Sequence, residues 1–157
     1  MSSAPDDREA RAEGGPAPRD FRFLHDVDVR FRDLDPMGHA HHSLPLMYWE
    51  EARARYWREV AGRASVADID YVMGEITVRF HRRIHYPARL IAGVRVTRLG
   101  RSSFDMSYGL WSHDDELLSS GRSTQVLFDY AAGRSRPFDD ETRRRIEAHE
   151  GRAISRP

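Results

Sequence analysis

The hydrophobic periodicity of the chain changes only a few times, and this restricts the folds open to it. Apolar and polar residues alternate over 25–32, which predicts a half-buried strand. From Ser43 to Gly62 the apolar residues recur at helical spacing instead, so we expect one long helix with a single buried face. Stretches of strand character follow at 71–84, 90–99, 104–111 and 117–130.

Turn residues at 100–102 and 112–115 join the later strands, which predicts an antiparallel meander. Ser43 is placed to cap the long helix, and Asp139 is placed to cap a closing helix that ends near His149. One strand, one long helix and then several antiparallel strands form an α+β plan, in which the sheet wraps around the helix.

The composition of the 157 residues predicts one folded domain with two tails. A hydrophobic content of 39% is enough for a real core, and we place that domain at 21–150. The ends, 1–20 and 151–157, hold too few apolar residues to offset the entropy cost of ordering the chain. We therefore expect a disordered N-terminal tail and a frayed C-terminal tail.

Charge and cysteine content exclude several classes of protein. The 25 basic and 25 acidic residues leave a net charge of zero, so no overall field attracts nucleic acid or an anionic membrane. The absence of cysteine excludes disulfides, thiol nucleophiles and zinc-thiolate sites. No stretch is apolar enough for a membrane span or a signal peptide, which predicts a cytoplasmic protein.

The segment DLDPMGHAHH, residues 33–42, stands where the first strand gives way to the helix. Asp35 ends the strand and precedes a tight Pro-Met-Gly turn, which can hold a carboxylate rigidly in a partly desolvated cleft. Such a carboxylate can attack a carbonyl carbon or activate a water molecule. The alternative is an Asx turn or a helix cap. Asp33 lacks the following turn and is expected to be structural.

The segment DLDPMGHAHHSLPLMYWEEAR resembles the signature of hotdog acyl-CoA thioesterases of the 4-hydroxybenzoyl-CoA thioesterase type. The matching residues are Asp33, Asp35, Gly38, His39, Trp49, Glu50, Ala52 and Arg53. The chain departs from the signature at His41 and His42, which replace two asparagines, and at Pro45, which replaces a tyrosine. The resemblance implies the hotdog fold, with an antiparallel sheet wrapped around a long central helix. It also implies a homodimer or homotetramer whose active site is completed across the dimer.

The resemblance implies that Asp35 is the catalytic base or nucleophile. Backbone N–H groups at a helix start can stabilise the oxyanion of a tetrahedral intermediate, and the family places this role near His42, with Gly38 assisting. His39 is expected to orient Asp35 or the substrate. Glu50 is a second candidate acid, because another branch of the fold carries its acid on the helix. Glu51 is expected to pair with Arg55, four residues on.

The histidine-rich segment also has ligand types suited to zinc or iron. His39, His41 and His42 stand close to Asp33 and Asp35, but no third ligand follows at a diagnostic spacing. Histidines that line a cleft are the simpler interpretation. We therefore predict no metal and no other cofactor.

A coenzyme A substrate carries phosphates, and a chain without net charge needs a local basic site for them. Arg98, Arg101, Ser102 and Ser103 surround a glycine turn and offer charged and neutral donors. The family binds the nucleotide end near this place, whereas solvent-exposed turn arginines are the alternative. Arg79, Arg82, Arg83 and Arg89 are further candidates.

The predicted function is hydrolysis of an acyl-CoA thioester to a carboxylic acid and free coenzyme A. Acyl carrier protein is an alternative carrier. A hotdog hydratase of enoyl thioesters and a non-catalytic acyl-thioester-binding protein are the alternative functions. The acyl group is not identified, because the aromatic residues able to line its pocket suit a plain core equally well: Trp49, Tyr56, Trp57, Tyr71 and Met73.

Overall fold

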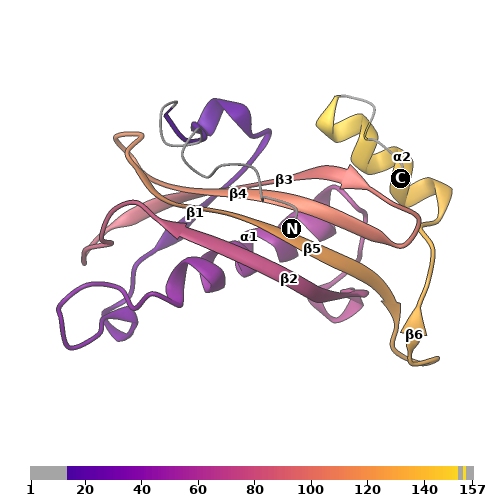
Figure 1. Cartoon of the computed structure of the whole chain (residues 1–157), viewed down its shortest axis with the longest axis horizontal. Helices are drawn as coiled ribbons and strands as arrows, with labels where there is room; N and C mark the ends of the chain where they lie inside the picture. Colours follow the sequence, from indigo (N-terminus) through magenta and orange to yellow (C-terminus); the bar gives the residue numbers. More distant parts are fainter. Residues whose placement is uncertain (1–13, 152–153, 155–157) are drawn as a thin grey trace, which may run out of the picture.

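A curled antiparallel sheet with one long helix packed against it makes up the fold, as the computed structural model shows (Figure 1). The structure describes residues 14–151 and residue 154. The strands are β1 (Phe23–Asp28), β2 (Tyr71–Phe80), β3 (Arg89–Leu99), β4 (Ser103–Ser112), β5 (Leu117–Asp129) and β6 (Arg134–Ser135), and the helices are α1 (Leu44–Glu59) and α2 (Asp140–Glu150). This confirms the predicted α+β plan.

The main sheet has the strand order β1-β3-β4-β5-β2, and short β6 pairs with β5. The predicted meander is right for β3, β4 and β5 but wrong for β2, which lies beyond β5 at the far edge. The reason is that β1 already occupies the free side of β3, with Phe23 opposite Val94. Strand β2 pairs instead with β5, from Tyr71 opposite Leu127 to Phe80 opposite Ser119.

Helix α1 buries one face against the sheet, as its periodicity predicts. Trp49, Ala52, Tyr56 and Trp57 are fully buried. The Trp49 indole N–H donates to the carbonyl of Gly109 on β4 (3.0 Å), and the Trp57 ring stacks on Phe104 at 4.8 Å. These contacts fix the position of the helix on the sheet. None of the helices in the described part of the chain is both long and apolar enough to cross a membrane.

The first strand ends earlier than its sequence predicts. Alternation continues to 32, yet β1 ends at Asp28, and Phe31–Asp33 form a 3-10 helix in which Phe31 is 75% exposed. The cause is Asp33, whose carboxylate accepts a hydrogen bond from the backbone N–H of Arg30 (2.9 Å). That local bond holds the chain in a turn, so the last part of the predicted strand is wrong.

The two predicted tails lie partly outside the described residues, which exclude 1–13, 152–153 and 155–157. Within the described part, Pro18–Asp20 form a 3-10 helix, and the Pro16 carbonyl accepts a hydrogen bond from the Trp111 indole (2.9 Å). At the other end Ile154 is buried. The predicted cap of α2 is confirmed, because the Asp139 carboxylate accepts from the Thr142 N–H (2.8 Å).

Asp70 ties the end of α1 to the sheet. Its carboxylate accepts hydrogen bonds from the Trp57 indole (2.7 Å), the Arg63 guanidinium (2.8 Å) and Arg136. Burial alone would raise the pKa of Asp70, but the hydrogen bonds from Arg63 and Trp57 and the charges of Arg63 and Arg136 hold that pKa below its ordinary value. The ionised form is therefore the one that stabilises the fold.

Replacing Asp70 by Asn should lower the free energy of unfolding by about 2–4 kcal/mol at pH 7, because two arginines lose their counter-charge. A lowered pKa means that this contribution is present above the unfolded-state pKa and is lost as the pH falls through the folded-state pKa. Urea unfolding should therefore show the difference from wild type shrinking below about pH 4. Asp114→Asn, in an exposed turn, is the control and should unfold like wild type. A pH-independent difference for Asp70→Asn would contradict this role.

Candidate functional site

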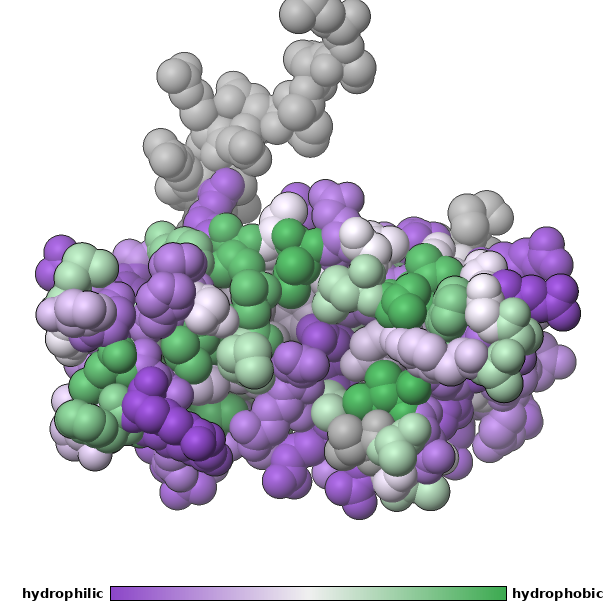
Figure 2. Space-filling view, turned by 90° about the horizontal axis from the view of Figure 1, so that it is seen from below, coloured by the Kyte–Doolittle hydropathy of each residue, from purple (hydrophilic) through white to green (hydrophobic). Residues whose placement is uncertain are grey.

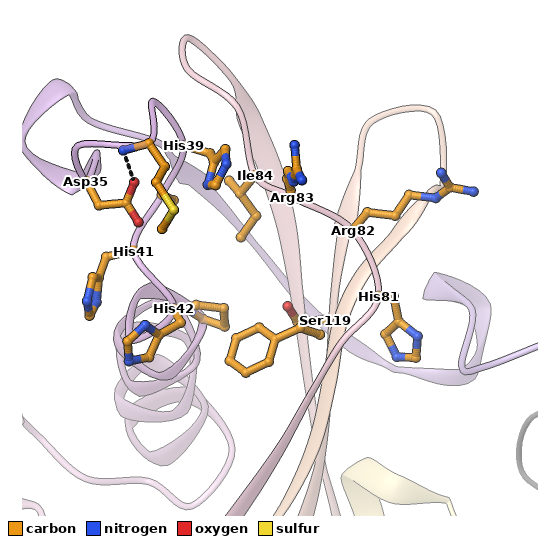
Figure 3. Close-up of a pocket in the computed structure, with 13 residues that line it drawn as sticks. Asp35, His39, His41, His42, His81, Arg82, Arg83, Ile84 and Ser119 are labelled. Atoms are coloured by element: carbon orange, nitrogen blue, oxygen red, sulfur yellow. Dashed lines mark hydrogen bonds between the residues drawn. The ribbon is translucent and has the colours of Figure 1, made fainter. Parts of the chain in front are cut away.

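Asp35 lies in a tight turn between the first strand region and α1. Leu34 and Ala40 form an isolated antiparallel bridge, and the Asp35 N–H donates to the His39 carbonyl (3.0 Å). One carboxylate oxygen, Oδ1, accepts from the Met37 N–H (2.9 Å; Figure 3). The Asx turn weighed as an alternative is thus present, but it uses only this oxygen. The other oxygen has no hydrogen-bond partner among the described residues.

Gly38 gives the turn its shape. Its φ of +86° lies in the left-handed region that favours glycine, and its N–H donates to the Asp35 carbonyl (3.0 Å). The amide expected to assist an oxyanion is therefore occupied by the turn itself. Gly38 contributes by positioning Asp35.

Asp33 anchors this turn to the helix. Its side chain is 9% exposed and accepts a hydrogen bond from the Tyr48 hydroxyl on α1 (2.7 Å). Burial and then the hydrogen bond and charge of Asp33 raise the pKa of Tyr48 well above its ordinary range, so this hydroxyl stays protonated. The Asp33 carbonyl also accepts from the His41 N–H (2.9 Å). These bonds give Asp33 the structural role expected of it.

A cavity of about 310 Å³ opens beside the turn. Its walls come from the Asp35 turn, the start of α1, the end of β2 with the residues after it, and the start of β5 (Figure 3). The lining residues are Asp35, Met37, His39, Ala40, His41, His42, Pro45, Phe80, His81, Arg82, Arg83, Ile84 and Ser119. Three predicted site residues, Asp35, His39 and His42, are thus brought together.

The rest of the cavity wall consists of residues 80–84 and Ser119. The sequence did not predict that these residues lie together. Phe80 and Ser119 lie side by side only because β2 pairs with β5. The single signal available was the basic pair Arg82 and Arg83, which had been one candidate among several. Burial, followed by the charge of Arg79, lowers the pKa of His81, whose ring contacts the Ser120 hydroxyl (2.9 Å).

His41 lies two residues before the N-cap of α1. Its Nδ1 accepts from the Ser43 N–H (3.2 Å) and contacts the Ser43 hydroxyl (2.9 Å). Ser43 is the N-cap residue as predicted, but its side chain makes no capping bond to the helix. The His42 N–H donates to no described residue, so it remains free at the helix start. No three His, Asp or Glu side chains converge into a metal site within 14–151.

Glu50 is not brought to Asp35. It lines a different hollow, of about 580 Å³, together with Asp26, Asp28 and Arg30.

The expected pairing of Glu51 with Arg55 is wrong, because the Glu51 carboxylate lies 2.8 Å from the His25 ring nitrogen instead. Strand β1 passes close enough to α1 to offer this partner, which the helix sequence alone does not reveal.

The four residues predicted to bind coenzyme A lie at the opposite end of the sheet. Arg98 is near the end of β3, about 30 Å along the strand from its start, and the Asp35 cavity is at that start. The Arg98 guanidinium donates to both Asp105 oxygens (2.7 and 3.2 Å) and to Ser103 Oγ (3.1 Å). The hydrogen bond from Arg98 holds the pKa of Asp105 below its ordinary value. Arg101 is exposed.

The chain is similar to a protein family and to several known proteins. A family model described as the thioesterase-like superfamily matches residues 29–146. A thioesterase of Thermus thermophilus, solved with coenzyme A and Zn, is 34% identical, with a TM-score of 0.78, over 85% of this chain and 98% of that one. YsmA, an uncharacterised protein of Bacillus subtilis (strain 168), is 24% identical over 77% of this chain and 82% of its own length.

A DHNA-CoA thioesterase from Staphylococcus aureus shares the fold at 20% identity and a TM-score of 0.71. The match covers 83% of this chain and 95% of that one. Together with the Thermus thermophilus structure, this likeness confirms the hotdog fold expected from the sequence.

Replacing Gly38 by Ala should cost about 1–2 kcal/mol of stability, the strain of a left-handed residue with a Cβ. Gly133→Ala is a matched control, since Gly133 also has positive φ and open space around its Cβ position. Both variants should unfold at lower urea concentration than wild type. Only Gly38→Ala should shift the amide NMR signals of residues 35–42, and unchanged signals there would mean that Gly38 does not shape the turn.

Proposed function

Because the chain belongs to the thioesterase-like superfamily, we propose that it hydrolyses an acyl-CoA thioester to a carboxylic acid and free coenzyme A. The main support for this proposal is the position and hydrogen bonding of the Asp35 carboxylate. Its Oδ1 is fixed by the Met37 N–H, while the second oxygen is unpaired among the described residues and the residue lines a cavity at the start of α1. A rigid carboxylate near the His42 N–H, which is unpaired in the described part of the chain, combines an acid-base group with a donor for the oxyanion, two features that favour acyl transfer to water.

In the proposed reaction the Asp35 carboxylate acts on the thioester carbonyl carbon. As a base it takes a proton from a water molecule whose oxygen bonds to that carbon; as a nucleophile it bonds to the carbon itself, and water then hydrolyses the acyl-enzyme. The negative charge that develops on the carbonyl oxygen is stabilised by the His42 N–H. The carbon–sulfur bond breaks, and the thiolate of coenzyme A leaves and takes up a proton.

The proposed assembly is a homodimer joined along β2, with pairing into a homotetramer as the larger alternative. Strand β2 is the edge strand beyond β5, and only Tyr71 of its residues is buried. Figure 2, seen from the side where β2 forms the edge in Figure 1, shows apolar patches on this side. Met73 and Phe80 are among the exposed apolar residues, at 37% and 55%. An unprotected edge of this length favours pairing with a second copy.

Such a dimer would bring the predicted phosphate site to the cavity. The Leu127 N–H donates to the Ser102 carbonyl (2.7 Å), and Leu127 faces Tyr71, so the Gly100 turn lies at the start of β2. Antiparallel pairing of two β2 edges places the start of one beside the end of the other. The Arg101 of one protomer then serves the cavity of its partner. Arg82 and Arg83, which line the cavity of their own chain, are the alternative phosphate ligands.

Hydration of an enoyl thioester, and binding of an acyl thioester without turnover, are the two alternative functions. Acyl carrier protein is the alternative to coenzyme A as carrier. Release of free thiol from a saturated acyl-CoA separates these functions, since only a thioesterase produces it. Among the described residues, no group of three or more His, Asp or Glu side chains could hold a metal ion. The proposed reaction uses none.

Replacing Asp35 by Asn should lower turnover of the best acyl-CoA by about 10²–10⁴-fold, the range for loss of a positioned acid-base group. The amide keeps the shape and the Met37 contact, so folding and substrate binding should persist. Thiol release measures turnover, and circular dichroism checks the fold. Glu50→Gln, in the other hollow, should stay active. An active Asp35→Asn beside an inactive Glu50→Gln would place the acid on α1.

The composite cavity predicts recovery of activity when two variants that are each poorly active at low acyl-CoA concentration are refolded together. Arg101→Glu should raise KM for acyl-CoA by removing a phosphate contact. Refolding it together with Asp35→Asn gives heterodimers with one intact site, and activity should return to roughly a quarter of wild type. No recovery, with a wild-type dimer confirmed by sedimentation, would assign the phosphates to the same chain and favour Arg82 and Arg83.

A further inference from the structure

A buried hydroxyl without a hydrogen-bond partner lies in the wall of the Asp35 cavity. The side chain of Ser119, near the start of β5, is 0% exposed, and its Oγ bonds to no described residue. Other buried side-chain atoms without a described partner belong to Arg95, Gln125, Arg143 and His149, and none of these residues lines that cavity. An unpaired buried hydroxyl is costly for the folded chain. Ser119 is therefore a polar group that nothing within the described chain uses.

A second serine on the inward face of β5 does have hydrogen-bond partners. Ser123 lies on the same face, four positions along, and its Oγ contacts the Tyr108 hydroxyl and accepts from the Gln125 amide (2.7 Å). Gly121 stands between the two serines, and a Cβ there would meet the Trp49 ring of α1 at 2.9 Å, so this face points toward the helix. Both serines are buried on one face, but only Ser123 has partners among the described residues.

The residues that line the cavity with Ser119 leave its Oγ without a hydrogen bond. The ring of His81 already contacts the hydroxyl of Ser120 (2.9 Å), the next residue along β5. Phe80, which faces Ser119 across the β2–β5 pair, is apolar, and Pro45 and Ile84 add apolar surface to the same cavity. Figure 3 shows Ser119 on the strand side of the cavity, across from Asp35 and His39. A molecule bound in the cavity that Ser119 lines can supply this partner.

On the basis of the proposed function, we infer that Ser119 Oγ is a specificity-determining group that hydrogen-bonds an oxygen on the acyl part of the substrate. Beside a hydrocarbon acyl group the hydroxyl would stay buried and without a partner, as it is in the described chain alone. An acyl group with a hydroxyl or keto oxygen at that depth pairs it, since a serine hydroxyl both donates and accepts. Sites built around a buried hydrogen-bonding group reject the analogue that lacks the matching atom.

The test uses pairs of acyl-CoA thioesters that differ only by one hydroxyl or keto group, over several chain lengths and ring positions. For the best-placed pair, wild type should favour the oxygenated member by about 10-fold to 100-fold in kcat/KM, the effect of leaving one buried polar group unpaired. Ser119→Ala should bring this ratio close to one. Thiol release gives both rates in one assay.

Ser123→Ala is the matched control, because it removes a buried hydroxyl from the same strand face outside the cavity. It should keep the wild-type substrate ratio but lower Tm, since Tyr108 and Gln125 each lose a contact. Ser119→Ala should not lower Tm, because no hydrogen bond within the described chain is lost. A structural role for Ser119 would reverse the Tm result and overturn the inference.

The remaining outcomes separate the two proposals. A wild-type protein that hydrolyses acyl-CoA but shows no preference within any pair overturns the role of Ser119 and leaves the thioesterase proposal standing. An equal fall in turnover of both members in Ser119→Ala also overturns it, and assigns the hydroxyl to the thioester carbonyl. A wild-type protein that releases no thiol from any member overturns the proposed function, and this inference with it.

Discussion

Two tryptophans hold α1 against the curled sheet, and the position of every site residue follows from that contact. Trp49 fits over Gly121 because glycine leaves room for the indole ring, and it donates to the Gly109 carbonyl. Trp57 stacks on Phe104 and also donates to Asp70. Burying a large aromatic side chain contributes about 1.5–3 kcal/mol or more. The hydrogen bonds add direction, so the helix has one position on the sheet.

From this fixed helix the site is built outward. Tyr48, next to Trp49, donates to the buried Asp33 carboxylate, which anchors the loop that carries Asp35. The Ala40 N–H donates to the Ile84 carbonyl (2.8 Å), which ties the same loop to the segment after β2. The candidate acid is thus held from the helix on one side and from the sheet on the other. Preorganisation of this kind is what lets a carboxylate act without rearrangement.

Local features of the sequence predicted much of the fold and part of the candidate site. The buried face of α1, the Asp139 cap and the turn at Asp35 all depend on residues a few positions apart. The features that were missed depend on pairing between distant segments. The place of β2 beyond β5, the Ser119 wall and the pairing of Glu51 with His25 need the assembled sheet. The pairing of Arg98 with Asp105 was missed for the same reason, because the two face each other across the β3–β4 hairpin.

The pairing of β2 with β5 has a consequence for the order in which the chain folds. Strands β3, β4 and β5 are joined by short turns, so their contacts close small loops and form early. His81 and Ser120, which meet at the cavity, are 39 positions apart, and the loop between them has to be closed first. A folding intermediate that contains only the β3–β4–β5 hairpins has the sheet residues that pack against α1, but it lacks the cavity wall at 80–84. The ability to bind substrate should therefore be acquired late, after most of the secondary structure has formed.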